Sequence, residues 1–296
     1  MSSRIHRLRG FGPDTFVKRD DELSFGVSGS KLRKMRSLVP HLLAARYEEV
    51  AVIAGSRSNN LLALFQACFE AGMRVKPFLL ESHSAQDGVW WPLFCDEKDV
   101  TWVPRSDWPR VEELASSYAE ESSRRVFVLP EGSYHPYAFE GAMTLADEIM
   151  SPKAHDLGPF DRILVDAGTG LTAKALLLGL SRYPHPPAVT VLMLAEPASP
   201  FKAGLESFAK QFSLSTENIP AYDLIRPSLG RSFGSTPAAV FKEIQRVARE
   251  EGILVDPIYS GKLFLAARSW AKADSRDLII HSGGGLSLGP YLNRFK

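Results

Sequence analysis

The stretch "ILVDAGTGLTAKALLLGL", residues 163–180, decides the fold. A short run of Ile, Leu and Val passes through two glycines into an apolar segment of helical length, which predicts a buried strand joined by a tight loop to a helix. Glycines let the backbone approach an anion, and the first N–H groups of a helix attract negative charge. We therefore predict a phosphate site, in preference to a turn that binds nothing, at Gly168, Thr169, Gly170, Leu171 and Thr172.

Strand and helix candidates alternate along the rest of the chain. "EVAVIAG" (49–55) precedes a helix candidate at 58–72, and "AVTVLMLAE" (188–196) and "DLIIHSGGG" (277–285) are further apolar runs. Continuous apolar strands are typical of a mainly parallel sheet covered by helices on both faces. Ligands of such sheets bind at the carboxyl ends of the strands, where Gly- and Ser-rich loops follow here. The Pro- and Gly-rich stretch 151–161 predicts a linker between two domains.

The composition excludes several classes of protein. With 296 residues, 45% of them hydrophobic and 23% charged, the chain can bury a full core, which excludes disorder. The 35 Lys and Arg nearly balance the 34 Asp and Glu, so the chain lacks the large positive net charge that attracts nucleic acid. Cys68 and Cys95 show neither metal-ligand spacing nor a pairing pattern, and no segment approaches membrane-spanning length. We expect a cytoplasmic protein with no metal and with neither nucleic acid nor membrane as a partner.

The segment "SGSKLRKMRSL" (28–38) places a basic cluster at a helix start. Ser30 can cap the helix, which puts Lys31 in its first turn. There the ammonium faces the positive end of the helix dipole, and Arg33 and Lys34 follow closely, so the protonated form is disfavoured. A neutral lysine is what a Schiff base requires. The alternative is a basic helix on the surface.

Other strand ends carry further candidate groups. In "AGSRSNN" (54–60), Ser58 and Asn59 can cap a helix; alternatively, Asn59 binds a ring oxygen while Ser58 meets a carboxylate or acts as a nucleophile. Tyr259 is either a half-buried packing residue or a catalyst. His281, at the end of an apolar strand, fits a core histidine better than a proton carrier.

The glycine loop also permits a different ligand. Gly168-x-Gly170-x-x-Ala173 satisfies a dinucleotide fingerprint, and Glu196 ends the next strand roughly twenty residues later, where a ribose-binding acid would lie. An NAD-dependent dehydrogenase is therefore a rival interpretation. It leaves Lys31 and the loop at 54–60 without a role.

Together these segments resemble the pyridoxal-phosphate enzymes of the tryptophan synthase β type, and most closely the aminocyclopropane-carboxylate deaminase and D-cysteine desulfhydrase family. "VKRDD" with "SGSKLRKMRSL", "AGSRSNN", "DAGTGLTAKALLLGL", "LVDPIYSGK" and "IIHSGGG" follow the family's motifs in order over nearly the whole chain. The resemblance implies an α/β fold of two three-layer αβα domains with mostly parallel twisted sheets. We expect a larger cofactor-binding domain at 1–41 plus 150–296 and a smaller, substrate-side domain at 42–149.

The resemblance also implies roles for single residues. Lys31 matches the lysine that carries pyridoxal 5'-phosphate and then moves the α-proton of a small amino-acid substrate. Ser58 matches the substrate-facing serine, Asn59 lies beside the cofactor ring, the loop at 168–172 matches the phosphate loop, and Tyr259 matches the active-site tyrosine.

Four positions depart from the family's motifs. The family has Gly, Asn, His and Gly at the positions that are Ser28, Ser30, Asn60 and Leu171 here. These changes leave the expected fold and cofactor in place, and they make the substrate the open question.

The chemistry expected from the resemblance depends on the partner of the pyridine nitrogen. The deaminases carry a Glu directly after the active-site tyrosine, where this chain has Ser260, and Ser282 is a second candidate. A hydroxyl that donates to an unprotonated nitrogen weakens the electron sink and suits loss of a good β-leaving group. We therefore predict a homodimeric, pyridoxal-phosphate-dependent lyase of desulfhydrase type that releases a keto acid and ammonia. The alternatives are an aminocyclopropane-carboxylate deaminase, the dehydrogenase, and a homologue that binds the cofactor without turnover.

Overall fold

The computed structural model describes residues 2–24, 29–81, 90–151, 154, 157–271 and 274–295. The contacts divide the chain into two compact units. Unit 1 is formed by Met1–Ser30 together with Ala142–Lys296, and unit 2 by Lys31–Gly141. Unit 1 is therefore assembled from two separate parts of the sequence, whereas unit 2 is one continuous segment.

Within the described residues, unit 1 contains a six-stranded sheet. The first pair of strands is antiparallel and all other neighbouring pairs are parallel. In spatial order the strands are β1 (Ile5–Arg7), β2 (Thr15–Arg19), β10 (Asp277–His281), β7 (Arg162–Ala167), β8 (Ala188–Met193) and β9 (Tyr222–Ile225). The central strand β10 is buried along its whole length, because helices cover both faces of the sheet.

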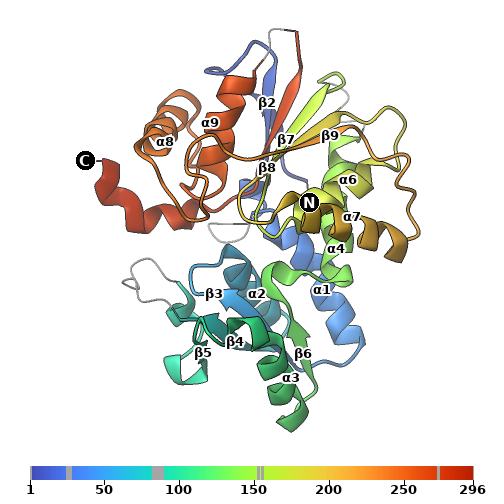
Figure 1. Ribbon diagram of the computed structural model, residues 1–296, viewed down its shortest axis with the longest axis vertical. Coiled ribbons are helices and arrows are strands. Elements are labelled where there is room, and N and C mark those ends of the chain that lie inside the picture. Colours follow the sequence, from blue (N-terminus) through green and yellow to red (C-terminus); the bar gives the residue numbers. More distant parts are fainter. Residues whose placement is uncertain are drawn as a thin grey trace. The chain divides into compact units, whose positions relative to one another are not determined.

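The helices of unit 1 form two layers around this sheet (Figure 1). On one face, α8 and α9 share an apolar cluster with Leu164 of β7 and Ile279 of β10. On the other side lie α6 and α7 (Figure 1), and the alternate β7 residues Ile163 and Val165 are buried there. The helices are α6 (Leu171–Leu180), α7 (Ala198–Gln211), α8 (Ala238–Glu251) and α9 (Ser260–Trp270). These elements make a three-layer αβα unit.

Unit 2 repeats this architecture on a smaller scale. The part of it that the structure describes holds a parallel, four-stranded sheet in the order β5 (Thr101–Val103), β4 (Arg74–Leu80), β3 (Glu49–Gly55) and β6 (Val126–Leu129). Along β3, Val50 and Val52 join the cluster formed with α1 (Lys31–Ala44) and α2 (Asn59–Glu70), while Ile53 packs with α3 (Val111–Glu121). The alternation of side chains along the strand thus fills a core on each face.

The remaining elements are short, apart from one long helix. The helix α4 (Pro136–Ile149) begins in unit 2 and ends in unit 1. The 3-10 helices are Asp20–Glu22, Trp91–Leu93, Glu97–Asp99, Trp108–Arg110, Glu131–Ser133 and Gly285–Phe295. Among the described residues, no helix combines the length and the apolar character needed to cross a membrane.

The unit boundaries differ from those expected for the domains. The sequence placed 1–41 with the larger domain, but the contacts assign α1 to unit 2. The reason is the apolar side of α1, where Met35, Leu38 and Leu42 pack in the same cluster as β3 and α2. The second boundary between the two units lies within α4, after Gly141, and not at 150. The predicted fold class, two three-layer αβα domains with mostly parallel sheets, is confirmed.

Candidate functional site

The predicted phosphate loop lies at the carboxyl end of β7. Gly168 accepts a hydrogen bond from the backbone N–H of Glu196 at 3.2 Å, and Gly170, with a φ of +76°, precedes the first residue of α6. A Cβ atom on Gly168 would lie 3.1 Å from Cε1 of Tyr259. The loop is therefore a tight backbone turn beside the ring of the candidate tyrosine, with the unpaired N–H groups of a helix start in it.

A buried carboxylate organises the segment that carries Tyr259 and Ser260. Asp256 is 0% exposed and accepts hydrogen bonds from the backbone N–H groups of Ile258, Tyr259 and Ser260. The hydroxyl of Ser260 donates to Oδ2 of Asp256 at 2.6 Å and accepts from the Asp256 N–H at 2.9 Å. Asp256 was not among the predicted site residues, although its position four residues before a helix-starting serine is a local signal of such a cap.

The second candidate hydroxyl, Ser282, lies at the carboxyl end of β10, the neighbour of β7. Its Oγ donates to Oδ1 of Asp166 at 3.1 Å, and both residues are buried. The carbonyl oxygen of Ser282 accepts from the backbone N–H and the hydroxyl of Ser30, at 3.0 and 3.3 Å. Ser30 is the last residue of unit 1, and Lys31 follows it in the chain. Ser28 lies outside the described residues.

These contacts change the expected role of both hydroxyls. Each has one proton, and that proton is donated to a carboxylate, Asp256 for Ser260 and Asp166 for Ser282. While these bonds are kept, both hydroxyls have only acceptor capacity left for a further partner. That one of them donates to an unprotonated ring nitrogen stays a prediction, and the observed bonds favour the acceptor role instead.

Unit 2 holds the other candidate residues at the start of α2. Ser58 is the N-cap, and its Oγ accepts from the backbone N–H of Leu61 at 3.3 Å, as the sequence indicated. Asn59 is the first helical residue and is half-buried. The next residue, Asn60, is 6% exposed and donates through Nδ2 to the hydroxyl of Ser133 at 2.8 Å. The Asn60 Oδ1 atom is buried without a hydrogen-bond partner among the described residues.

The basic cluster of unit 2 is only partly a surface feature. Lys31 begins α1 and is half-buried. Arg33 and Lys34 are 4% and 3% exposed, and the Lys34 ammonium donates to the carbonyl oxygen of Gly132 at 3.0 Å. A solvated basic helix therefore does not describe these two residues, whereas Arg36 does face solvent.

Glu196 and His281 were considered as functional residues in alternative interpretations of the sequence. Both have partners within the fold. Glu196, the expected ribose-binding acid of a dehydrogenase, accepts through both carboxylate oxygens from the ammonium of Lys174, at 2.9 and 2.7 Å. In the sequence, Lys174 is a charged residue within an otherwise apolar helix. That unexplained charge is the signal that could have indicated a buried partner. His281 is 0% exposed, its Nε2 lies 3.0 Å from the carbonyl oxygen of Leu254, and burial lowers its pKa. It is the core histidine that the sequence indicated.

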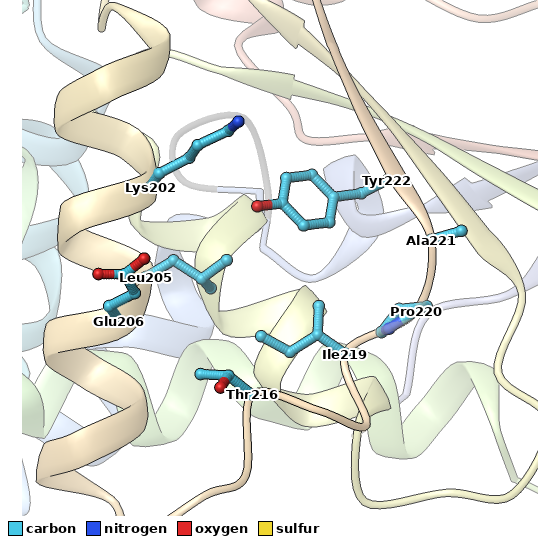
Figure 2. A pocket seen from close by; sticks show the side chains of 8 residues that line it. All are labelled: Lys202, Leu205, Glu206, Thr216, Ile219, Pro220, Ala221 and Tyr222. Atoms are coloured by element: carbon cyan, nitrogen blue, oxygen red, sulfur yellow. The ribbon is translucent and has the colours of Figure 1, made fainter.

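A pocket of about 370 Å³ opens elsewhere in unit 1 (Figure 2). It lies between α7 and the segment before β9 and is lined by Lys202, Leu205, Glu206, Thr216, Ile219, Pro220, Ala221 and Tyr222. Tyr222 is the first residue of β9 and pairs with Val189 near the start of β8. The pocket is therefore at the amino ends of the strands, and the glycine loop at their carboxyl ends.

Comparison with known proteins identifies the family. Residues 3–283 match the family model described as pyridoxal-phosphate dependent enzyme. The chain belongs to this family. A putative 1-aminocyclopropane-1-carboxylate deaminase of Pyrococcus horikoshii is 27% identical over 299 residues, covering 93% of this chain and 86% of that protein. The 1-aminocyclopropane-1-carboxylate deaminase of Cyberlindnera saturnus is 26% identical over 337 residues, covering 99% and 92%.

Solved structures agree with the family assignment. The crystal structure of an ACC deaminase homologue superposes with a TM-score of 0.82 at 25% identity, covering 100% of this chain and 93% of that one. An O-ureido-L-serine synthase superposes with a TM-score of 0.70 at 17% identity, which shows the fold. The predictions of a pyridoxal-phosphate-dependent enzyme and of this cofactor are confirmed.

The loop of unit 1 fits the phosphate of that cofactor. Gly170 has a φ of +76°, which favours glycine, and a Cβ there would lie 2.3 Å from Oε2 of Glu196, so that side chain would have to shift. The first turn of α6 adds backbone N–H groups, and Thr169 and Thr172 are half-buried hydroxyl residues beside them. An anion at this position is stabilised by donors and by the helix dipole.

Proposed function

We propose that the chain deaminates a small amino acid, with 1-aminocyclopropane-1-carboxylate as the first candidate substrate. The observation that carries this proposal is the Asp256–Ser260 hydrogen bond of 2.6 Å. The resemblance makes Ser260 a candidate partner of the pyridine nitrogen, with Ser282 as the second, and a hydroxyl that donates its proton to a carboxylate accepts there. An acceptor favours the protonated nitrogen and hence a strong electron sink. This removes the reason for preferring a desulfhydrase, and relatives named as deaminases support the change.

The residues of unit 1 hold and tune the cofactor in this proposal. When bound, pyridoxal phosphate supplies an aldehyde that reacts with amino groups and a ring that takes up electrons. The N–H groups of the loop at 168–172 and the hydroxyls in it bind the phosphate. Ser260 accepts from the ring nitrogen, Ser282 borders the same strand edge, and Tyr259 positions or relays a proton.

The residues of unit 2 act on the substrate and on the reactive carbon. Lys31 would hold the cofactor through its amine, and its Nζ would move the α-proton of the substrate. Ser58 and the N–H groups at the start of α2 bind the substrate carboxylate, because a helix N-terminus stabilises an anion. Asn59 orients the cofactor ring, and Ser58 is the nucleophile if the substrate is cyclic.

Borohydride trapping tests the lysine. The purified protein should show a visible absorbance band that borohydride abolishes, with the reduced adduct on a peptide containing Lys31. Lys31→Arg should lose the band, since the guanidinium keeps the charge but does not form the bond. Lys34→Arg, the same change in the same helix, should keep it. A band that survives in Lys31→Arg contradicts the assignment of this lysine.

Turnover tests the substrate. Ammonia and keto-acid release should be highest with aminocyclopropane-carboxylate in a panel that includes D-cysteine, L-cysteine and D-serine. Sulfide release from D-cysteine as the dominant reaction would restore the desulfhydrase. A protein that forms the trapped adduct but turns over none of these compounds would support the non-catalytic alternative.

We also propose a cytoplasmic homodimer. Cys68 and Cys95 are free thiols, as a reduced compartment allows. Sedimentation velocity measures the mass in solution, and a monomer that is fully active would contradict the dimer.

A further inference from the structure

A buried ion pair lies against the glycine loop of unit 1, and the roles proposed above do not use it. The ammonium of Lys174 donates to Oε1 and Oε2 of Glu196 at 2.9 and 2.7 Å, and to the carbonyl oxygen of Thr169 at 3.3 Å. The Lys174 side chain is 0% exposed and that of Glu196 17%. The ring of Phe201 covers the ammonium, with Nζ 4.8 Å from the ring centroid. A fully desolvated lysine with these contacts is held in one place.

The ion pair and the loop pack as one body. A Cβ atom added to Gly170 would come within 2.3 Å of Oε2 of Glu196 and within 2.8 Å of Nζ of Lys174. The backbone N–H of Glu196 also donates to the carbonyl oxygen of Gly168 at 3.2 Å. The side chains of the pair therefore pack directly against the backbone of Gly170.

Three consecutive carbonyl groups of the loop accept hydrogen bonds from Glu196 or Lys174, two from their backbone N–H groups and one from the Lys174 ammonium. The Gly168 oxygen accepts from Glu196 N, the Thr169 oxygen from Lys174 Nζ, and the Gly170 oxygen from Lys174 N, at 3.2, 3.3 and 2.9 Å. In a planar trans peptide, the N–H of each following residue points opposite to the preceding C=O. The N–H groups of Thr169, Gly170 and Leu171 are therefore directed away from the pair. A row of N–H groups on one side of a loop is an anion-binding arrangement.

We propose that Lys174 and Glu196 are positioning residues for phosphate binding. Their side chains fix the middle carbonyl group, that of Thr169, between two carbonyl groups bound by backbone N–H groups, so that the N–H groups of the loop are presented to the phosphate. The pair is neutral as a whole, so its contribution is orientation and not an added net charge. This inference rests on the proposed function, in which the phosphate belongs to pyridoxal phosphate.

The test separates the phosphate from the rest of the cofactor. Pyridoxal phosphate and pyridoxal are titrated by absorbance into the full chain stripped of cofactor, and the ratio of the two Kd values measures what the phosphate contributes. Lys174→Met removes the ammonium and keeps the length of the side chain. We expect the preference for the phosphorylated form to fall by about 10- to 100-fold, as for loss of a hydrogen bond to a charged group. The affinity for pyridoxal should stay unchanged.

A second buried ion pair in unit 1 provides a matched control. Lys18 and Glu148 lie 2.6 Å apart with side chains 1% and 18% exposed, which closely matches the burial of the pair at the loop. Lys18→Met should weaken the fold to a similar extent, measured by thermal unfolding, but should leave the Kd ratio unchanged. If both variants lower the ratio equally, the effect is general destabilisation and the inference is wrong.

A variant without either charge covers the case in which Lys174→Met fails to fold. Lys174→Met combined with Glu196→Gln leaves no unpaired buried carboxylate, so it should fold and show the same reduced ratio. A folded single or double variant with the wild-type ratio overturns the inference. A wild-type protein that binds neither compound overturns the proposed function, and this inference with it.

Discussion

Replacing Asp256 by Asn tests the hydrogen-bond network at the start of α9. The carboxylate accepts through Oδ1 from the N–H groups of Ile258 and Tyr259, each at 2.8 Å, and through Oδ2 from N and Oγ of Ser260, at 2.9 and 2.6 Å. An Asn side chain has the same shape but only one acceptor oxygen. Its NH₂ group then faces two donors that have lost their acceptor.

The expected cost follows from the number of bonds lost. A hydrogen bond to a buried charged group contributes about 1.5–3 kcal/mol, and the Ser260 hydroxyl can rotate to accept from the new amide. One to two bonds are therefore lost, and the free energy of unfolding should fall by about 2–5 kcal/mol. Urea unfolding followed by circular dichroism measures this, at fixed cofactor concentration because a bound ligand shifts the apparent stability.

Ser260→Ala is the companion variant for this change. It removes one bond to the carboxylate and the acceptor of the Asp256 N–H but leaves three backbone N–H groups on the carboxylate, so it should cost about 2–4 kcal/mol. If neither variant lowers the free energy of unfolding, the carboxylate does not organise this segment and the argument for an acceptor hydroxyl fails.

Three further outcomes are expected. Gly170→Ala should lower the melting temperature and abolish tight cofactor binding in a titration, because its φ of +76° is strained for Ala and the new Cβ would lie 2.3 Å from Oε2 of Glu196. Burial, and secondarily a nearby histidine, lower the pKa of His135, so the folded state binds this proton less readily than the unfolded state. The free energy of unfolding should therefore be highest above about pH 6.5 and fall as the pH drops below that value. His135→Gln should flatten this pH profile. Burial raises the pKa of Cys68 to about 12 and that of Cys95 to about 11, so both thiols should react slowly with Ellman's reagent at pH 8 until denaturant is added.

Much of the fold followed from patterns that are local in the sequence. The stretch at 163–180 predicted a strand, a glycine loop and a helix, and the structure has β7 at Arg162–Ala167 and α6 at Leu171–Leu180. Alternation of apolar runs with helical segments was enough for the fold class, because a buried parallel strand needs no partner to be recognised. Ser58 as a cap also followed from its position before an apolar helix.

Features that depend on distant partners did not follow. A proline inside a helix tends to kink or break it, but α1 continues through Pro40 to Ala44, since the buried Leu38 and Leu42 on either side anchor both parts in the core of unit 2. The same packing moved α1 out of the larger domain. Helical periodicity shows that a face is apolar and does not show which sheet it will cover.

The site was predictable as a set of loops and not as a set of hydrogen bonds. Ser260 and Ser282 were recognised, but their protons go to Asp256 and Asp166, and in the second case the partner is 116 residues away. Lys174 could be noticed only as an unexplained charge in an apolar helix. Which acceptor a hydroxyl or ammonium finds depends on three-dimensional packing, and this decides whether it donates or accepts toward a ligand.

The two bonds from Ser30 to the carbonyl oxygen of Ser282 have a consequence for synthesis on the ribosome. In the sheet of unit 1, β10 lies between β2 and β7, so the middle of the sheet is made late, at Asp277–His281. Unit 2 is continuous and can fold while the chain is still growing. Ser30, the residue before Lys31, should therefore be anchored only after nearly the whole chain has emerged. In nascent chains arrested before β10, unit 2 should resist protease while unit 1 is still cleaved.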